Sequence, residues 1–411
     1  MTAWPDARLD HLRTLGDQPA DAAVAAHFAE RPAQAPVDLV AATTGRRSIA
    51  GVADSAPLTD FLRAPVELPR WARVPGSAEL VRAGQDVFAL YGLQIGSALF
   101  CASLPEGYAA PAIARTLWAT ARLTDEPRRR VAETAQFLVD TMEHGGLEPG
   151  RPGYESVRRV RLMHAAVRHH ATAAEPGLVA VNQEELLGTL MTFTWVPFTA
   201  IERFGLPLSD ADRAAYLHCW NVIGFLIGVE PEVLPLTLAD MAELEGAFRR
   251  RYQRSGEASE PGVLLTDALV TMMQGYLPAW LWLLRGMPAT TIRHLIGEEV
   301  ADLTAVPLAD WTRVLYAPLA DAARRVRLGP PGLWAVRRVA TTFGRRLLAE
   351  FARRESRGER PAFAVPDQLA RTWKLHRLPT RPPADPAASG HVADRFRPPI
   401  GRTAFSVAQS Q

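Results

Sequence analysis

One stretch of the sequence combines an imidazole with two guanidinium groups at helical spacing. At about 100° per residue, Arg161, His164 and Arg168 fall on one helix face together with Val157 and Val160. A single imidazole on a mostly apolar face suits the axial position of a haem iron, because the porphyrin supplies the other four ligands. Guanidinium groups one turn away suit the haem propionates, since they match a carboxylate and stay charged when buried. The same spacing also fits a core histidine hydrogen-bonded to a neighbour, so both interpretations stay open.

The helix expected before this one carries polar residues on its inward face. Asp125–Pro127 provides a capping carboxylate and an early proline, and the helical pattern runs to about Met142. Arg130 and Thr134 share a face with Phe137, so both polar groups need partners. The partner is either another helix or a polar ligand.

Composition limits the classes of protein that fit. The chain has 411 residues, is 48% hydrophobic and has a net charge of +2, which argues against nucleic-acid binding. Its only lysine is Lys374. Cys101 and Cys219 lie in apolar contexts, which predicts buried thiols and no disulfide framework. The first residues show no export signal, so a cytoplasmic location is predicted.

The hydrophobic periodicity predicts an all-α fold. No run of alternating β-branched residues is long enough for a sheet, and the nucleotide-binding, zinc-peptidase and serine-hydrolase motifs are missing from the sequence. Further helices are expected over Ser77–Leu99, Pro111–Leu123 and from the N-terminal capping residues Asn182–Glu185 through Thr194, with an interruption near Pro197.

Three further segments each allow two interpretations. A capping box at Ser209 opens a buried helix to Val229, in which His218 is either a second ligand or a hydrogen-bonded core histidine. The most hydrophobic segment, Val263–Leu284, is interpreted as a core helix pair, with interfacial contact as the alternative. The arginine doublets of Arg324–Arg360 indicate an amphipathic helix whose basic face meets either solvent or an acidic lipid surface.

Four segments in this order resemble the latex clearing protein family. They are RRRVAETAQFLVD from Arg128, RLMHAAVR from Arg161, QEELLGTLMTF from Gln183 and AYLHCWNVIGFLIGV from Ala215. This family comprises the haem b rubber oxygenases, which are related to the fungal membrane-bound oxygenases of mycophenolic acid assembly. The resemblance covers roughly Ser77 to Leu236.

The resemblance implies a globin-related helical core around a non-covalent haem b, with additional peripheral helices. His164, in the R-x-x-H-x-x-x-R pattern, is the implied axial ligand, and Arg161 and Arg168 hold the propionates or brace the ligand. Arg130 and Thr134 match the arginine and threonine near the distal face. The expected organisation is residues 1–75 as peripheral helices and loops, 76–378 as the catalytic domain, and 379–411 as a proline-rich disordered tail.

Two departures from the family pattern affect the chemistry. Rubber oxygenases have a lysine just before the threonine that can cap the iron, whereas this chain has Glu133, so an open or water-bound distal position is expected. The family also uses a glutamate on the preceding helix as a base, and no carboxylate lies between Pro111 and Leu123. Glu133 is the available substitute, although it points about 100° away from Thr134.

The sequence therefore predicts a haem b-dependent oxygenase that uses O₂ on an apolar, isoprenoid-like substrate, with oxidative C=C cleavage as the leading reaction. Peroxidase-like or hydroxylating chemistry is the alternative within haem enzymes. A helical binding protein for a hydrophobic ligand, with His164 only structural, is the alternative outside them. Contact with a membrane surface stays open.

Overall fold

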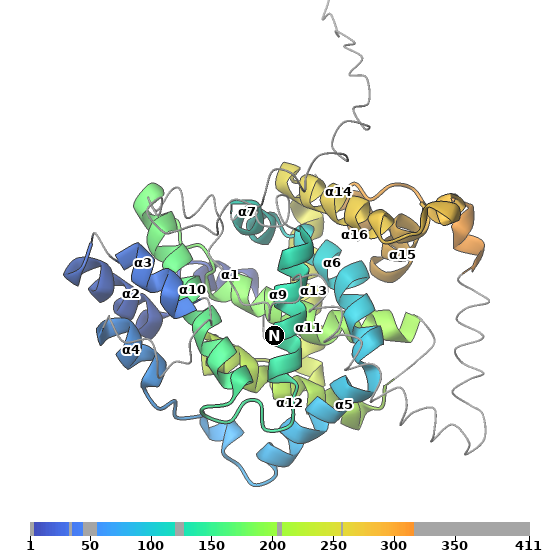
Figure 1. The fold of residues 1–411 in the computed structure, drawn as a ribbon. Helices are drawn as coiled ribbons and strands as arrows, with labels where there is room; N and C mark the ends of the chain where they lie inside the picture. Colours follow the sequence, from blue (N-terminus) through green and yellow to red (C-terminus); the bar gives the residue numbers. More distant parts are fainter. Residues whose placement is uncertain are drawn as a thin grey trace, which may run out of the picture.

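The computed structural model describes residues 4–32, 35–43, 56–119, 127–203, 208–255 and 258–315. The fold is all-α, as predicted, and the described residues contain no strand. Helices from distant parts of the sequence surround a common centre (Figure 1). The first half comprises α1 (Asp6–Leu12), α2 (Gln18–Glu30), α3 (Ala35–Thr43), α4 (Ala56–Arg63), η2 (Arg70–Ala72), α5 (Ser77–Ala98), the π-helix η3 (Leu99–Ser103), α6 (Leu104–Tyr108), α7 (Pro111–Ala119) and α9 (Pro127–Thr141). The second half comprises α10 (Pro152–Ala174), α11 (Gln183–Arg203), α12 (Asp210–Ile227), η4 (Pro231–Val233), α13 (Leu238–Ser255), α14 (Glu260–Gly275), η5 (Ala279–Leu284), α15 (Met287–Ile296), α16 (Glu298–Leu303) and η6 (Trp311–Leu315).

The packing of α5 against α12 forms the base of the main hydrophobic core. A methyl group at Gly84 would lie 2.6 Å from the carbonyl oxygen of Ala215 and 2.7 Å from Cβ of Cys219, so only glycine permits this approach. Ser209 accepts a hydrogen bond from the Asp212 amide at 3.1 Å, which confirms the predicted cap of α12.

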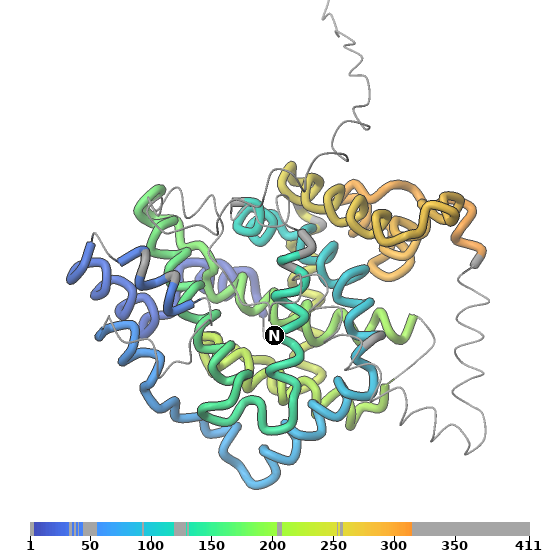
Figure 2. The backbone as a smooth tube through the Cα atoms, in the orientation of Figure 1, coloured from blue at the N-terminus to red at the C-terminus, as the bar shows by residue number. Residues whose placement is uncertain are grey.

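Helix α10 lies between two hydrophobic clusters. Leu162 and Ala166 pack in a smaller cluster with α2, α3 and α4, whereas Val157 and Val160 pack in the main core. The backbone tube shows α2, α3 and α4 along one side of α10, whereas α9 and α12 lie on the other (Figure 2). Each face of α10 therefore has its own packing partners.

Two predictions about helix continuity are wrong. Helix α11 does not stop near Pro197 but continues to Arg203, because Val196, Phe198 and Ile201 are buried and their packing outweighs the hydrogen bond lost at the proline. Val263–Leu284 is not a core helix pair: α14 is partly buried, but none of the residues of η5 is buried.

The remaining predictions about the ends of elements depend on which residues are described. Helix α7 is seen to Ala119, and its predicted continuation to Leu123 lies outside the described residues. The basic segment Arg324–Arg360 and the tail 379–411 also lie outside them, so the domain boundaries stay predictions.

None of the described helices is by itself long and apolar enough to span a membrane. The pair Ser77–Gly92 and Gln94–Tyr108 is so only jointly, and it is bent by 78°.

Candidate active site between helices α9 and α10

Helices α9 and α10 run antiparallel beside each other and bring the predicted site residues to one level. A methyl group at Gly153 would lie 2.8 Å from Cα of Thr141, so the end of α9 touches the start of α10. Counting eleven residues along each helix from this contact reaches Arg130 and His164, both about 16 Å away at 1.5 Å per residue. Thr134 lies one turn from Arg130 on the same face.

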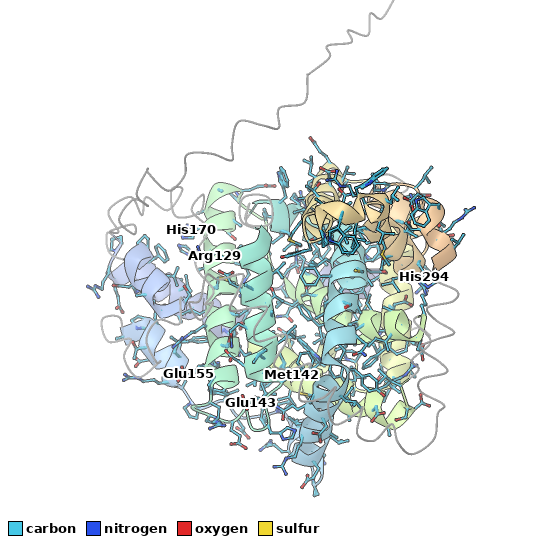
Figure 3. All side chains as sticks on the ribbon, turned by 45° about the vertical axis from the view of Figure 1, so that its right-hand side comes forward. Arg129, Met142, Glu143, Glu155, His170 and His294 are labelled. Atoms are coloured by element: carbon cyan, nitrogen blue, oxygen red, sulfur yellow. The ribbon has the colours of Figure 1, made fainter. Side chains whose placement is uncertain are left out.

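Side chains labelled in Figure 3 show the same register. Met142 and Glu155 lie at one end of the helix pair, and Arg129 and His170 lie at the other. The site residues of the two helices therefore come from between these two ends.

His164 faces the main core. On α10 it lies within about 20–40° of Val157 and Val160, which are both buried there. The residue itself is half-buried, and its Nδ1 atom is shielded from solvent. On α9, Phe137 and Leu138 are buried in the same core. The faces that carry His164 and Thr134 are thus directed into one shared interior.

Arg161 is held by a carboxylate from the N-terminal segment. Its Nε and a terminal nitrogen donate to the two carboxylate oxygens of Asp17 at 2.6 and 2.8 Å. Little of either side chain is exposed, 12% of Arg161 and 2% of Asp17. This fork satisfies the guanidinium group within the protein, so its predicted role toward propionates would require it to share or exchange Asp17.

Arg168 has both satisfied and unsatisfied donors. Its Nε donates to Asp21 at 2.8 Å and its Nη1 to the Val181 carbonyl at 2.7 Å. Its Nη2 is buried and has no hydrogen-bond partner. Leaving such a buried cationic donor unsatisfied is costly, so it is suited to donate a hydrogen bond to an additional anionic group.

Glu185 fixes the segment that contacts Arg168. Val181 has φ of +50°, a backbone conformation that is strained for a β-branched residue. Its N–H donates to Glu185 Oε2 at 2.9 Å, and its carbonyl accepts from Arg168. Thr116 of α7 also donates to Glu185 Oε2, at 3.1 Å, which links α7 to α10 through two buried charges. Burial raises the pKa of Glu185 to about 7 despite these hydrogen bonds.

The distal candidates on α9 are described to different degrees. The backbone of Arg130 is helical, but its side chain lies outside the described residues. Thr134 is half-buried. Glu133 is buried and forms an ion pair with Arg129 at 3.3 Å, so the proposed substitute base already has a cationic partner on its own helix.

Glu106 is a buried carboxylate that the sequence analysis did not identify. It lies on α6 directly after the π-helix η3, is fully buried, and pairs with Arg249 at 3.2 Å. Burial raises its pKa to about 7, and Arg249 partly opposes that rise. The available signal was a single acidic residue inside an otherwise uncharged stretch from Leu99 to Ile113.

The other candidate ligands are structural. His218 Nε2 lies 2.8 Å from Ser77 Oγ at the start of α5, which supports the core-histidine interpretation. Cys101 and Cys219 are free and buried as predicted, and burial raises the pKa of each thiol to about 12.

A cavity of about 450 Å³ lies among α1, α7, α11 and α13. Its lining includes Glu184, whose carboxylate is 3.1 Å from both Arg13 and Arg251. The charged side chains in this wall are matched to each other and do not suit an apolar molecule. The interior between α9 and α10 is the better candidate site.

Comparison with known proteins identifies the family. A sequence model of the family described as ER-bound oxygenase mpaB/B'/Rubber oxygenase, catalytic domain, matches residues 81–354. The chain belongs to this oxygenase family. It is 25% identical to the rubber oxygenase of Streptomyces sp. (strain K30) over 332 residues, which cover 75% of each protein. A solved structure of latex clearing protein LCP in the closed state has the same fold, with a TM-score of 0.64 at 20% identity, and the match covers 87% of this chain and 95% of the other.

These matches confirm the predicted family and extend the resemblance beyond Leu236. The matched region includes α9 and α10 but begins after Asp17 and Asp21. The carboxylates that hold Arg161 and Arg168 therefore come from a segment that the family pattern does not include.

Proposed function

We propose that this oxygenase binds haem b at His164 and uses O₂ to cleave a C=C bond of an apolar, isoprenoid-like substrate. The observation that carries the proposal is the position of Arg130 and Thr134 on α9 at the level of His164 on α10, with both faces directed into one core. The name of the Streptomyces relative supports a polyisoprene-like substrate.

The donor set of this region fits a haem. Haem would need one imidazole from the protein, because the porphyrin supplies the other four ligands. His164 supplies that imidazole from a rigid, well-packed helix. The unsatisfied Nη2 of Arg168, one turn away, supplies a buried donor that a propionate would satisfy.

Each residue then has a defined task. Haem, when bound, supplies the site at which O₂ is activated. His164 would ligate the iron, and the Asp17–Arg161 pair fixes the turn of α10 that carries His164. The guanidinium of Arg130 and the hydroxyl of Thr134 can donate hydrogen bonds to a polar group near them. A carboxylate that removes a proton from the substrate must not be occupied in an ion pair. Glu133 can therefore serve as a base only if its ion pair with Arg129 breaks.

An absorption spectrum tests the cofactor. The wild type, expressed with added haem, should show a Soret band and a pyridine haemochrome equivalent to about one haem per chain. His164→Ala should lose or shift the band. His170→Ala is the matched control, because this half-buried histidine lies about 120° around the same helix from His164, and it should retain the band. A colourless wild type would refute the proposal and favour a helical binding protein.

Product analysis tests the reaction. Carbonyl products from an isoprenoid alkene that appear with O₂ and without added peroxide would support C=C cleavage. Products that require peroxide would refute cleavage by O₂ and indicate a peroxidase-like enzyme on the same scaffold.

A further inference from the structure

The exposed large apolar side chains of the described chain are concentrated in one region. Seven of them belong to the stretch from Tyr276 to Val314 at the end of the molecule formed by α14, α15 and α16 (Figure 1). Trp280, Trp282 and Trp311 expose 77%, 64% and 51% of their surfaces. We call this set the aromatic patch; it consists of Tyr276, Trp280, Trp282, Leu283, Leu308, Trp311 and Val314.

A braced backbone holds the aromatic patch. Gln274 of α14 donates to the carbonyl of Arg285 at 3.0 Å, which fixes the end of η5. The start of η6 is joined to α15 by a 2.8 Å hydrogen bond from the Thr312 hydroxyl to Thr290. Any side chain at Gly286 would collide with the carboxylate of Asp310, so η5 and η6 meet closely at this glycine. The tryptophans are therefore presented by a fixed surface and not by loose ends.

Charged side chains of both signs lie around the patch, and the sequence that follows the patch is basic. Arg285 and Arg313 are exposed and lie in or beside the same 3₁₀ helices. Of the four carboxylates beside the patch, Glu298 and Asp302 pair with the buried Arg293. Asp310 accepts a hydrogen bond from the Thr312 amide at 2.9 Å, and Glu299 is exposed on α16. The sequence that continues from η6, residues 316–360, contains eleven arginines and four carboxylates, a net charge of +7.

We propose that the aromatic patch docks on the surface of an anionic lipid bilayer. Tryptophan and tyrosine favour the lipid–water boundary, because their rings are amphipathic, and arginines beside them attract acidic headgroups. The charge of residues 316–360 favours a bilayer over a second copy of the chain as the partner. Two copies would each contribute this segment of net charge +7 and repel each other, whereas an anionic bilayer has the complementary sign. This inference concerns a face distinct from the site between α9 and α10, and it holds whether or not the proposed reaction is correct.

Co-sedimentation of the full-length holoprotein with vesicles tests the proposal. The vesicles consist of phosphatidylcholine with about one-third phosphatidylserine, and pure phosphatidylcholine vesicles provide the neutral comparison. We expect the wild type to bind the anionic vesicles and to dissociate at high salt, where charge is screened. The double variant Trp280→Ser with Trp282→Ser should partition at least tenfold more weakly.

The matched control is Leu80→Ser with Leu236→Ser, which removes two exposed apolar side chains outside the patch. It should bind vesicles like the wild type. Far-UV circular dichroism and thermal melting verify that both variants are folded, as expected for changes at exposed positions. Equal loss of binding in the two variants would overturn the assignment to the patch.

Three other outcomes would overturn the proposal. The first is no co-sedimentation of the wild type, or equal binding to neutral vesicles at every salt concentration. The second is a wild-type dimer by light scattering that the tryptophan variant converts to a monomer, which identifies a second copy as the partner. The third is protection of Trp280 and Trp282 from oxidation without vesicles, which shows that another part of the chain covers them. In contrast, protection of Trp280 and Trp282 from oxidation only when anionic vesicles are added would support the docking proposal.

Discussion

The ion pair between Asp17 and Arg161 makes a quantitative prediction. Asp17→Asn keeps the size of the side chain and one acceptor oxygen but leaves the guanidinium of Arg161 buried without a counter-charge. Breaking a buried ion pair by removing one partner costs about 3–5 kcal/mol. Because the asparagine oxygen still accepts one of the two hydrogen bonds, we expect a loss near the lower limit, about 3 kcal/mol in the free energy of unfolding.

Urea unfolding followed by circular dichroism measures this loss. The control is Asp10→Asn, which removes a similarly short pair with Arg251, at 2.8 Å, whose carboxylate is 63% exposed. An exposed pair contributes less than about 1 kcal/mol. The double variant Asp17→Asn with Arg161→Gln should recover part of the loss, because it removes the uncompensated charge. If Asp17→Asn is no more destabilising than Asp10→Asn, the assignment of this pair as a structural brace of α10 is refuted.

Three further predictions use other contacts. The pKa of Glu185 is raised to about 7 in the folded state, so its stabilising contribution is complete below about pH 4 and is lost as the pH rises through 7. In urea unfolding, the wild type should therefore lose up to about 3 kcal/mol of stability relative to Glu185→Gln between pH 5 and 8. Parallel pH profiles of the two proteins would contradict this prediction. Gly228→Ala should lower the melting temperature more than Gly150→Ala. Both glycines have positive φ, but a methyl group at Gly228 would lie 2.3 Å from an Asp17 oxygen, whereas Gly150 has open space around it. Equal changes in melting temperature would contradict this prediction. The two cysteines should not react with a thiol reagent at pH 8 until urea unfolds the protein, and fast labelling of the native state would show that they are accessible.

Local sequence patterns predicted the elements that have strong boundary signals. Pro127 at the start of α9, the Ser209 cap of α12 and the apolar faces of α5 and α10 each specify structure within a few turns of chain. Pro197 was misinterpreted because the hydrophobic packing around it depends on distant helices. For Val263–Leu284 the sequence favours a core helix pair over interfacial contact, whereas Trp280 and Trp282 are exposed, since hydrophobicity alone does not tell whether another element covers a segment.

The candidate site was predictable only in part. Helical spacing placed His164 and the arginines of α10, and the antiparallel pairing with α9 brought Arg130 and Thr134 to the same level. The spacing did not reveal Asp17, because it lies 144 residues from Arg161. No periodicity within one helix can specify a partner at that separation.

That separation also bears on how the protein is made. At synthesis rates of about 5–20 residues per second, roughly 7–30 s pass between the appearance of Asp17 and that of Arg161. During this interval α2 has neither its ionic partner nor the face of α10 that buries Val24 and Ala20. The N-terminal helices precede the residues matched by the family's sequence model, yet they can dock only after the helix proposed to bind the cofactor has been synthesised. Chaperone binding to the nascent chain should therefore concentrate on residues 18–43 and decline once α10 has left the ribosome.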